Sequence, residues 1–515
     1  MMSSSSAFHR GFLKCRGGAC SVCRQRASIR SVALPTSSRR EFEIEIDSTR
    51  YSKIVLMEMT LPPLPLPSDD KCNRNDEGSK DQISQLPDEL IVSILSFMTL
   101  KEAVRTSVLS HRWKQLWPFF TGSLDFDDPD TFWAIADRKK KMKGERRKFV
   151  KRVNHVLKLH QGSNIDQFRV CFEFDNHHKH HIDGWIDSAI SKGVKGLELD
   201  FTPTEACEKQ MLYTFPHERF ISIKSSVFGV SCIKSLTSLT LIYVRVTGEL
   251  LEHFVSNCPL LERLHVAYSE DLVTLKICSS SLRLKHLNII RCWELKRIEI
   301  FAPNLESFGL VARAMEMYVN YAPRLLDVHV YVGAYDYLNY ALCPLSSYLS
   351  QLQSLTLDFY IAPISPHSQN MEFPKFQTLP KLKYLKWRVS TGDGMSLISF
   401  ISMIEAAPFL QKFSLELFWD KSRRERELRK VMKYPNEHLK EVEITGFVGR
   451  AIDIELTVYL LESAIKLEKL VINPRSPALV GTPWEFVRVE ENEGAIECAK
   501  QFKKNLPIGA ELFIL

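Results

Sequence analysis

Clusters of cysteine and histidine are the residues of this sequence whose spacing comes nearest to metal chemistry. Cys15, Cys20 and Cys23 form one group, but a zinc site needs four ligands at regular spacing, and the next cysteine, Cys72, is far away. Four histidines stand at 177, 178, 180 and 181. Neutral imidazoles bind Zn, Cu or Ni, but four of them on one short polar loop cannot all face one ion. We therefore expect no metal site and predict that the histidines lie on an exposed loop.

The short motifs that accompany catalysis are missing. The sequence contains no G-x-x-x-x-G-K-[ST], no G-x-G-x-x-G after a strand, no H-E-x-x-H and no G-x-S-x-G. The acidic residues beyond position 190 are scattered, and no pair has a spacing that indicates a general acid and base. We expect no catalytic residue and no cofactor, and hence a protein that acts by binding.

The charge of the chain is concentrated in two segments. The 515 residues carry a net charge of +7, but residues 1–40 hold eight basic and no acidic residues, and residues 138–152 hold ten basic residues and one acidic residue. The rest of the chain therefore sums to −10, which argues against a broad nucleic-acid-binding face. The twelve cysteines form no dense framework, which favours a reducing compartment. No run of about 18 apolar residues predicts a membrane helix.

Residues 1–80 are first basic and then rich in proline and polar residues. This leader cannot bury enough apolar surface to fold, so we predict that it is disordered. Residues 1–40 have the composition of an organelle transit peptide. The alternative, which we favour, is that translation starts at Met57 or Met59. We expect the protein in the nucleus, the cytoplasm or both, with organelle import only if residues 1–40 are a genuine transit peptide.

Residues 81–122 carry the strongest local signal, a pattern that predicts three short helices. Pro87 suits a first helical turn, and aliphatic residues follow it at helical spacing. Thr99 and Glu102 form a capping box for a second helix, and Ser110 can cap a third. Three such helices cannot bury two tryptophans alone, so we predict a docking module completed by a partner. The alternative is a helical subdomain packed on its own chain.

Residues 86–117 read LPDELIVSILSFMTLKEAVRTSVLSHRWKQLW. This segment resembles an F-box, the module that attaches a protein to the Skp-type adaptor of a cullin–RING ubiquitin ligase. The positions that match the F-box pattern are Leu86, Pro87, Leu90, Ile94, Leu95, Val108, Leu109, Ser110, Arg112, Trp113 and Trp117. The resemblance implies that these residues form the adaptor-binding module. Within it, the two tryptophans hold the module together, and the adaptor receives Leu86, Pro87, Ile94, Leu95 and Val108.

Residues 123–190 are predicted to be a linker with an amphipathic helix near 149–157 and a first strand near 168–174. The basic run 138–152 overlaps the start of this helix. We interpret the run as a solvated helix face and a charged loop; a nuclear import signal or a nucleic-acid patch are the alternatives.

From residue 191 the unit L-x-x-L-x-L recurs, which predicts an α/β fold of stacked repeats over 191–435. Its fourth position supplies an aliphatic or aromatic anchor, and after a first gap of 42 residues the anchors recur every 20 to 30 residues. This is the period of leucine-rich repeats, which stack into a solenoid with parallel strands on the concave face and helices and loops outside. The anchors are Leu197, Leu239, Leu264, Leu287, Phe308, Val328, Leu355, Leu385, Phe413, Val442 and Leu470. Cys292 occupies the Asn/Cys position of the repeat consensus. A non-repetitive α/β fold is the alternative.

Side chains next to the anchors should line the concave face and contact a target protein of unknown identity. These target-binding candidates are Thr240, His265, Asn288, His329, Thr356, Asp358, Lys386, Arg388, Ser414 and Glu416. Residues 436–515 resemble the FBD motif that follows F-box and leucine-rich repeats in plant proteins. We expect this segment to add two strands to the stack and to cap it with a helix near 456–465.

The order of these segments resembles that of the plant F-box/leucine-rich-repeat/FBD proteins. The resemblance implies the substrate-recognition subunit of an SCF-type E3 ubiquitin ligase, which brings a target close to the charged conjugating enzyme while other subunits transfer ubiquitin. Two alternatives stay open: an F-box scaffold that acts outside a ligase, and an organelle-imported nucleic-acid-binding repeat protein. Against the latter, the repeats have no arginine or aromatic residue at a fixed position in each unit. We expect neither a nucleic acid nor a membrane as partner.

Overall fold

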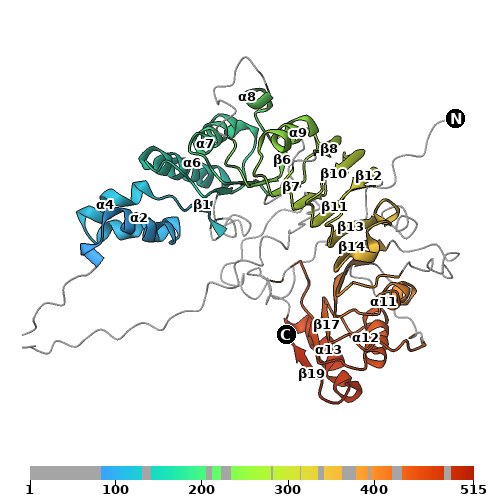
Figure 1. The fold of residues 1–515 in the computed structure, drawn as a ribbon. Coiled ribbons are helices and arrows are strands. Elements are labelled where there is room, and N and C mark those ends of the chain that lie inside the picture. The colour runs from blue at the N-terminus through green and yellow to red at the C-terminus, as the bar shows by residue number, and fades with distance from the viewer. Residues whose placement is uncertain are drawn as a thin grey trace, which may run out of the picture.

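A curved parallel sheet with helices on its outer side forms most of the structure, a computed structural model (Figure 1). The described residues are 83–129, 131, 141–203, 212–221, 233–279, 282–313, 315–333, 342–361, 378–391, 396–419, 428, 432–478, 480 and 489–515. The predicted leader 1–80, with the cysteine group at 15–23, lies outside them.

The predicted three-helix module is present at the N-terminal end of the described chain. Its elements are η2 (Ile83–Gln85), α2 (Asp88–Ser96), α3 (Leu100–Arg105), η3 (Thr106–Val108), α4 (His111–Leu116) and η4 (Trp117–Phe119). The predicted caps are confirmed, because Thr99 and Glu102 form a reciprocal capping box at α3 and the Ser110 hydroxyl accepts the Trp113 N–H at α4. Pro87 stands at the N-cap of α2, one residue before the first turn.

The main sheet has fourteen strands among the described residues, all parallel and arranged in the order of the chain. They are β1 (Ser123–Asp127), β2 (Gln167–Cys171), β3 (Gly196–Asp200), β5 (Ser238–Ile242), β7 (Arg263–Ala267), β9 (His286–Ile290), β11 (Ser307–Val311), β13 (Asp327–Gly333), β14 (Ser354–Ile361), β15 (Tyr384–Thr391), β16 (Lys412–Trp419), β17 (Glu441–Thr445), β18 (Lys469–Asn473) and β19 (Glu511–Ile514). Because β1 and β2 fall within residues 123–190, the segment predicted to be a linker belongs to the solenoid itself.

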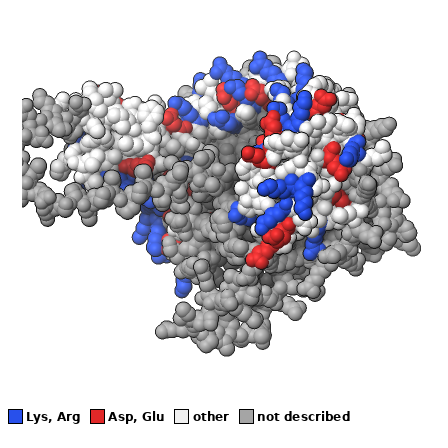
Figure 2. Space-filling model, turned by 90° about the horizontal axis from the view of Figure 1, so that it is seen from below, with Lys and Arg blue, Asp and Glu red and all other residues white. Residues whose placement is uncertain are grey.

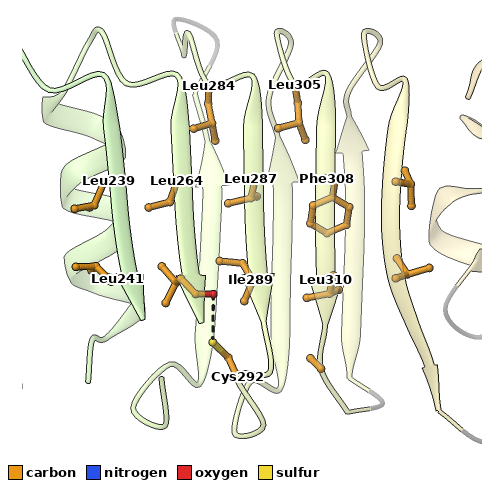
Figure 3. Packing of buried hydrophobic residues seen from close by; sticks show 14 of the residues in the cluster. Leu239, Leu241, Leu264, Leu284, Leu287, Ile289, Cys292, Leu305, Phe308 and Leu310 are labelled. Carbon is orange, nitrogen blue, oxygen red and sulfur yellow. Dashed lines mark hydrogen bonds between the residues drawn. The ribbon is translucent and has the colours of Figure 1, made fainter. Parts of the chain in front are cut away.

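The predicted anchors form one continuous ladder across this sheet. Each is paired with the anchor of the next strand, as in the row Leu239, Leu264, Leu287, and each exposes at most 1% of its surface. Figure 3 shows these side chains on one side of the strands, stacked from unit to unit. The thiol of Cys292 is buried and lies 3.8 Å from the Val266 carbonyl oxygen, as its consensus position predicts. The leucine-rich-repeat architecture is therefore confirmed.

The outer side of the solenoid differs from the prediction of helices and loops alone. Helices cover the longer units: α6 (Met142–Leu159), α7 (Lys179–Ser191), α8 (His217–Ile221), α9 (Gly248–Asn257), α11 (Ile401–Glu405), α12 (Ala451–Ser463) and α13 (Val489–Gln501). In the middle, β8 (Thr274–Cys278), β10 (Arg297–Phe301) and β12 (Glu316–Tyr321) form a second parallel sheet. The anchors are closest there, and an extended strand covers about twice the distance per residue that a helix covers. A strand therefore spans the outer side of a unit with fewer residues than a helix needs, and the short units have strands there.

The four histidines do not lie on an exposed loop, contrary to the prediction. His177 and His178 belong to η5 (Asn176–His178), and the other two begin α7. The carboxylate of Asp175 causes the turn, because it accepts the backbone N–H of His177 and lies 2.8 Å from the ring of His178. Within the described residues, no group of three His, Cys, Asp or Glu is placed to hold a metal ion. None of the described helices has the length and apolar character needed to span a membrane.

The C-terminal segment adds three strands to the sheet where two were predicted. These are β17, β18 and β19, and the predicted helix is α12, which begins at Ala451, five residues earlier than expected. The buried carboxylate of Asp453 accepts the backbone N–H groups of Val448, Gly449 and Arg450 and so fixes the start of α12. Burial raises the pKa of Asp453 to about 6.

Candidate functional site

The helical module has a buried side that holds it together. Ile91 and Leu95 face inward from α2, one helical turn apart, and pack with the two predicted tryptophans, Trp113 and Trp117, in the continuous core of the molecule. The resemblance implied that Leu95 inserts into an adaptor. The structure instead places it fully inside the module, because it shares the inward face of α2 with Ile91.

The module also carries large apolar side chains that are exposed to solvent. Leu90 exposes 51% of its surface, Val108 85% and Leu109 65%, and Ile94 is exposed as well. Sequence reasoning missed Phe97, which is 90% exposed at the end of α2. Its spacing to Leu90 and Ile94 follows a helical stripe, and this periodicity could have identified it. We refer to Leu90, Ile94, Phe97, Val108 and Leu109 as the apolar docking surface.

Arg112 connects the start of the module to its last helix. Its guanidinium donates to the backbone carbonyl oxygen of Leu86 at 2.5 Å and to the Asp88 carboxylate at 2.8 Å. Leu86 is half-buried beside it, and Pro87 is exposed. The arginine of the matching pattern therefore holds the Leu-Pro start of α2 in place.

The module is fixed to the first strand of the solenoid. The Ser96 hydroxyl accepts the Thr121 N–H at 3.1 Å, and the Pro118 carbonyl oxygen accepts the N–H groups of Gln161 and Gly162. Gly122 permits this close approach, because a Cβ there would lie 2.4 Å from the Ser96 carbonyl oxygen. The apolar docking surface therefore has one orientation relative to the repeats.

The ten target-binding candidates lie together on the concave side of the sheet. Register pairs bring them side by side, as with Thr240, His265 and Asn288 on β5, β7 and β9, and with Thr356, Lys386 and Ser414 on β14, β15 and β16. Most are half-buried, but Asp358 and Ser414 expose only 8% and 5% of their surfaces.

Five of these candidates form one ion-pair network. Asp358 lies 2.9 Å from the His329 ring and 3.3 Å from the guanidinium of Arg388. Arg388 and Lys386 both reach Glu416, at 2.9 Å and 2.5 Å. Burial alone would raise the pKa of Asp358, but the neighbouring His329 and Arg388 hold it below its usual value. A ligand at this end of the face must therefore match or displace existing pairs.

A row of residues that sequence reasoning missed follows the strands β5, β7 and β9. Tyr243, Tyr268 and Arg291 each take a left-handed backbone conformation, with φ of 53°, 54° and 55°. Each donates its N–H to the last carbonyl of the next strand, and the two tyrosine rings stack at 4.3 Å with the Arg291 guanidinium beside them. Such left-handed positions in residues other than glycine are uncommon, and they recur at the fourth position after the anchor on β5, β7 and β9. No residue type at these positions indicates the conformation from the sequence.

The charges on the face viewed in Figure 2 are mixed, with Lys and Arg side chains interspersed among Asp and Glu. At the N-terminal end of the sheet, Arg169 pairs with Asp125, Asp127 and Glu198, all within 2.9 Å. In the basic run, Arg146 pairs with Glu173 and Arg152 with Asp128. Arg146 and Arg152, two of the ten basic residues of this run, are therefore neutralised by ion pairs.

Comparison with protein families finds matches for both the helical module and the repeats. The model of the F-box domain matches residues 83–118, and the model described as "At1g61320/AtMIF1, LRR domain" matches residues 156–480. The chain belongs to the F-box/leucine-rich-repeat family. Residues 83–118 are therefore called the F-box below.

Relatives of this F-box/leucine-rich-repeat protein occur in Arabidopsis thaliana. F-box/LRR-repeat protein 25 is 32% identical over 242 residues, which cover 45% of this chain and 86% of the relative. F-box/LRR-repeat protein At3g58940 is 26% identical over 76% of this chain and 65% of its own length. F-box/FBD/LRR-repeat protein At5g22660 is 24% identical over 76% of this chain and 89% of its own length. The match to the third is consistent with the FBD resemblance of residues 436–515.

Proposed function

We propose that this F-box/leucine-rich-repeat protein is the substrate-recognition adaptor of an SCF-type ubiquitin ligase. The observation that carries the proposal is the apolar docking surface. Five large apolar side chains are exposed on a small helical module in which Ile91, Leu95 and the two tryptophans are packed into the core. An exposed apolar patch of this kind is typical of a protein–protein interface, and a Skp-type adaptor is the partner that covers it in the proposal.

The fixed junction supports the second half of the proposal, a target held on the solenoid. Because the F-box has one orientation relative to the repeats, a target on the concave face keeps one position relative to the adaptor. This raises the effective concentration of its lysines near the conjugating enzyme. The chain itself then supplies binding and position, and other subunits supply the chemistry. We place this activity in the nucleus or the cytoplasm.

Affinity purification of tagged full-length protein tests the proposal. The wild type should retain a Skp-type adaptor and a cullin, whereas Val108→Ser with Leu109→Ser should lose both by about a hundredfold. Both residues are exposed, so the variant should melt at the wild-type temperature. The control is Phe409→Ser, which removes an exposed phenylalanine from the repeats and should change nothing. Retention of the adaptor without any cullin would favour the scaffold alternative, and no loss in the double variant would contradict adaptor docking.

A further inference from the structure

The two ends of the solenoid are covered differently. At the first strand, Leu124 and Phe126 are fully buried because the F-box packs against β1. At the last strand, the equivalent Leu512 and Ile514 are only half-buried. In the part of the chain that the structure describes, β19 pairs with β18 alone. The C-terminal end of the sheet therefore exposes part of its core.

The backbone of β19 is also available at this end. Glu511 and Leu515 donate their N–H groups to carbonyl oxygens of Glu468 and Ile472, at 2.9 and 3.0 Å, on the β18 side. Because N–H directions alternate along a strand, Leu512 and Ile514 direct theirs to the open edge. Such an edge is a template for another strand.

The helix that borders this edge has an ordered pattern of charge. A groove along the edge is lined by Lys500 and Lys503 together with Leu506, Leu512 and Ile514. On α13, Glu493, Ile496 and Lys500 share one face, because they are spaced by three and four residues, and Lys503 follows in η12 (Phe502–Asn505). The charge along this stripe therefore changes from acidic at Glu493, through apolar at Ile496, to basic at Lys500 and Lys503. Glu497, the residue after Ile496, is exposed and adds to the acidic half.

We propose that a second copy of this chain covers the C-terminal end, with the two β19 strands paired antiparallel about a two-fold axis. The axis reverses the partner's helix as well as its strand, so that the two α13 helices run antiparallel beside each other. Glu493 then lies opposite the partner's Lys500 and the partner's Lys503, and the reverse pairs form by symmetry. Ile496 lies near the axis, where its half-exposed side chain meets its own copy.

Charge complementarity favours a copy over an unrelated peptide as the occupant. Lys500 already pairs with Glu497 of its own helix at 2.5 Å, but both side chains are more than half exposed, so this pair contributes little. An acidic peptide would neutralise Lys500 and Lys503 but leave Glu493 without a partner, whereas the reversed helix places opposite charges at both ends of this face. The F-box lies at the far end of the arc from β19 and α13 (Figure 1). The dimer therefore leaves both docking surfaces accessible, and its formation does not depend on the proposed ligase function.

Sedimentation velocity of the full chain at micromolar concentrations tests this inference. Wild type should show a reversible dimer. Lys500→Glu with Lys503→Glu makes the stripe acidic, and Glu493→Lys with Glu497→Lys makes it basic. Each double variant alone should lose at least about tenfold in dimerisation affinity, and an equimolar mixture of the two should restore it. Dimerisation of the mixture requires opposite charges across the interface. Misfolded variants would not dimerise when they are mixed.

The F-box supplies the control, because its exposed apolar surface could also associate. Val108→Ser with Leu109→Ser should leave the dimer unchanged. A dimer that disappears in this variant and persists in both charge variants would overturn the inference. A wild type that stays monomeric, or charge variants that do not recover when mixed, would overturn it as well.

Discussion

The Nε2 atom of His160 lies 2.6 Å from the carbonyl oxygen of Phe120 and joins the end of α6 to the segment directly after the F-box. On the other side of the ring, the Lys192 ammonium lies 3.0 Å from Nδ1. An ammonium can only donate, so Nδ1 accepts and Nε2 carries the proton that it donates to Phe120. The Lys192 contact therefore requires a neutral imidazole, and the two contacts of the ring connect the segment after the F-box with the ends of α6 and α7.

This requirement predicts a pH dependence of stability. Burial, together with the charge of Lys192, lowers the pKa of His160 below its usual 6.5, although the bond to Phe120 opposes the shift. A group whose pKa is lower in the folded state stabilises the fold above its unfolded pKa, and this stabilisation is lost as the pH falls below 6.5. His160→Gln keeps a donor near Nε2 but cannot titrate. Its free energy of unfolding should fall less between pH 7.5 and 5.5 than that of the wild type, as measured by urea denaturation. If the free energy of unfolding fell equally with pH in the variant and the wild type, His160 would not be a buried neutral imidazole in the folded protein.

Two neighbouring residues of α2 should separate adaptor binding from folding. Leu95→Ala removes a fully buried side chain and should cost about 2–5 kcal/mol in the free energy of unfolding. Ile94→Ala truncates an exposed side chain of the docking surface, so it should leave the melting temperature unchanged and weaken binding of a Skp-type adaptor by about tenfold. Thermal melts and adaptor titrations of the two variants provide the measurements. If Ile94→Ala bound normally, this part of α2 would lie outside the interface.

The repeat architecture could be predicted because its signal is local and periodic. A buried anchor every 20 to 30 residues is visible in the sequence, and every predicted anchor is buried. The strand β2 was predicted as part of a linker, because helix and loop residues separate it from the regular repeats, and β1 was missed. Leu95 was misplaced because helical spacing alone cannot tell which stripe of an amphipathic helix faces its own core. The stack of Tyr243 and Tyr268 depends on left-handed backbone conformations in consecutive units, which no residue type there indicates.

The ion-pair network on the concave face should contribute to stability as well as to a binding surface. Arg388→Met leaves the buried Asp358 and the half-buried Glu416 without the guanidinium between them and should cost roughly 2–4 kcal/mol at neutral pH. The pKa of Asp358 is held below its usual 3.8, so the stabilisation exists above that value and is lost as the pH falls through the lower folded pKa. The difference in the free energy of unfolding between the variant and the wild type, measured by urea denaturation, should therefore become smaller at acidic pH.

Arg297 offers the matched control for this network. It pairs with Glu299 and Glu316 on the outer sheet, where its side chain is 46% exposed. Exposed pairs contribute little, so Arg297→Met should barely change the denaturation midpoint. Equal effects of the two substitutions would mean that the concave network is as solvated as the outer pair.

Adjacent residues on one strand test the repeat architecture most directly. Leu287 is fully buried in the anchor ladder, and Leu287→Asp places a charge among aliphatic side chains or forces its protonation, at a cost of several kcal/mol. Asn288 is half-exposed on the concave side, and Asn288→Asp, which keeps the shape of the side chain, should cost less than about 0.5 kcal/mol. The residues differ by one position, so the contrast isolates the alternation of side chains along β9. Leu355→Asp and Thr356→Asp repeat the comparison on β14. Thermal melts of the four variants should fall into two groups, and similar destabilisation within a pair would mean that the strand does not present its second residue to the concave face.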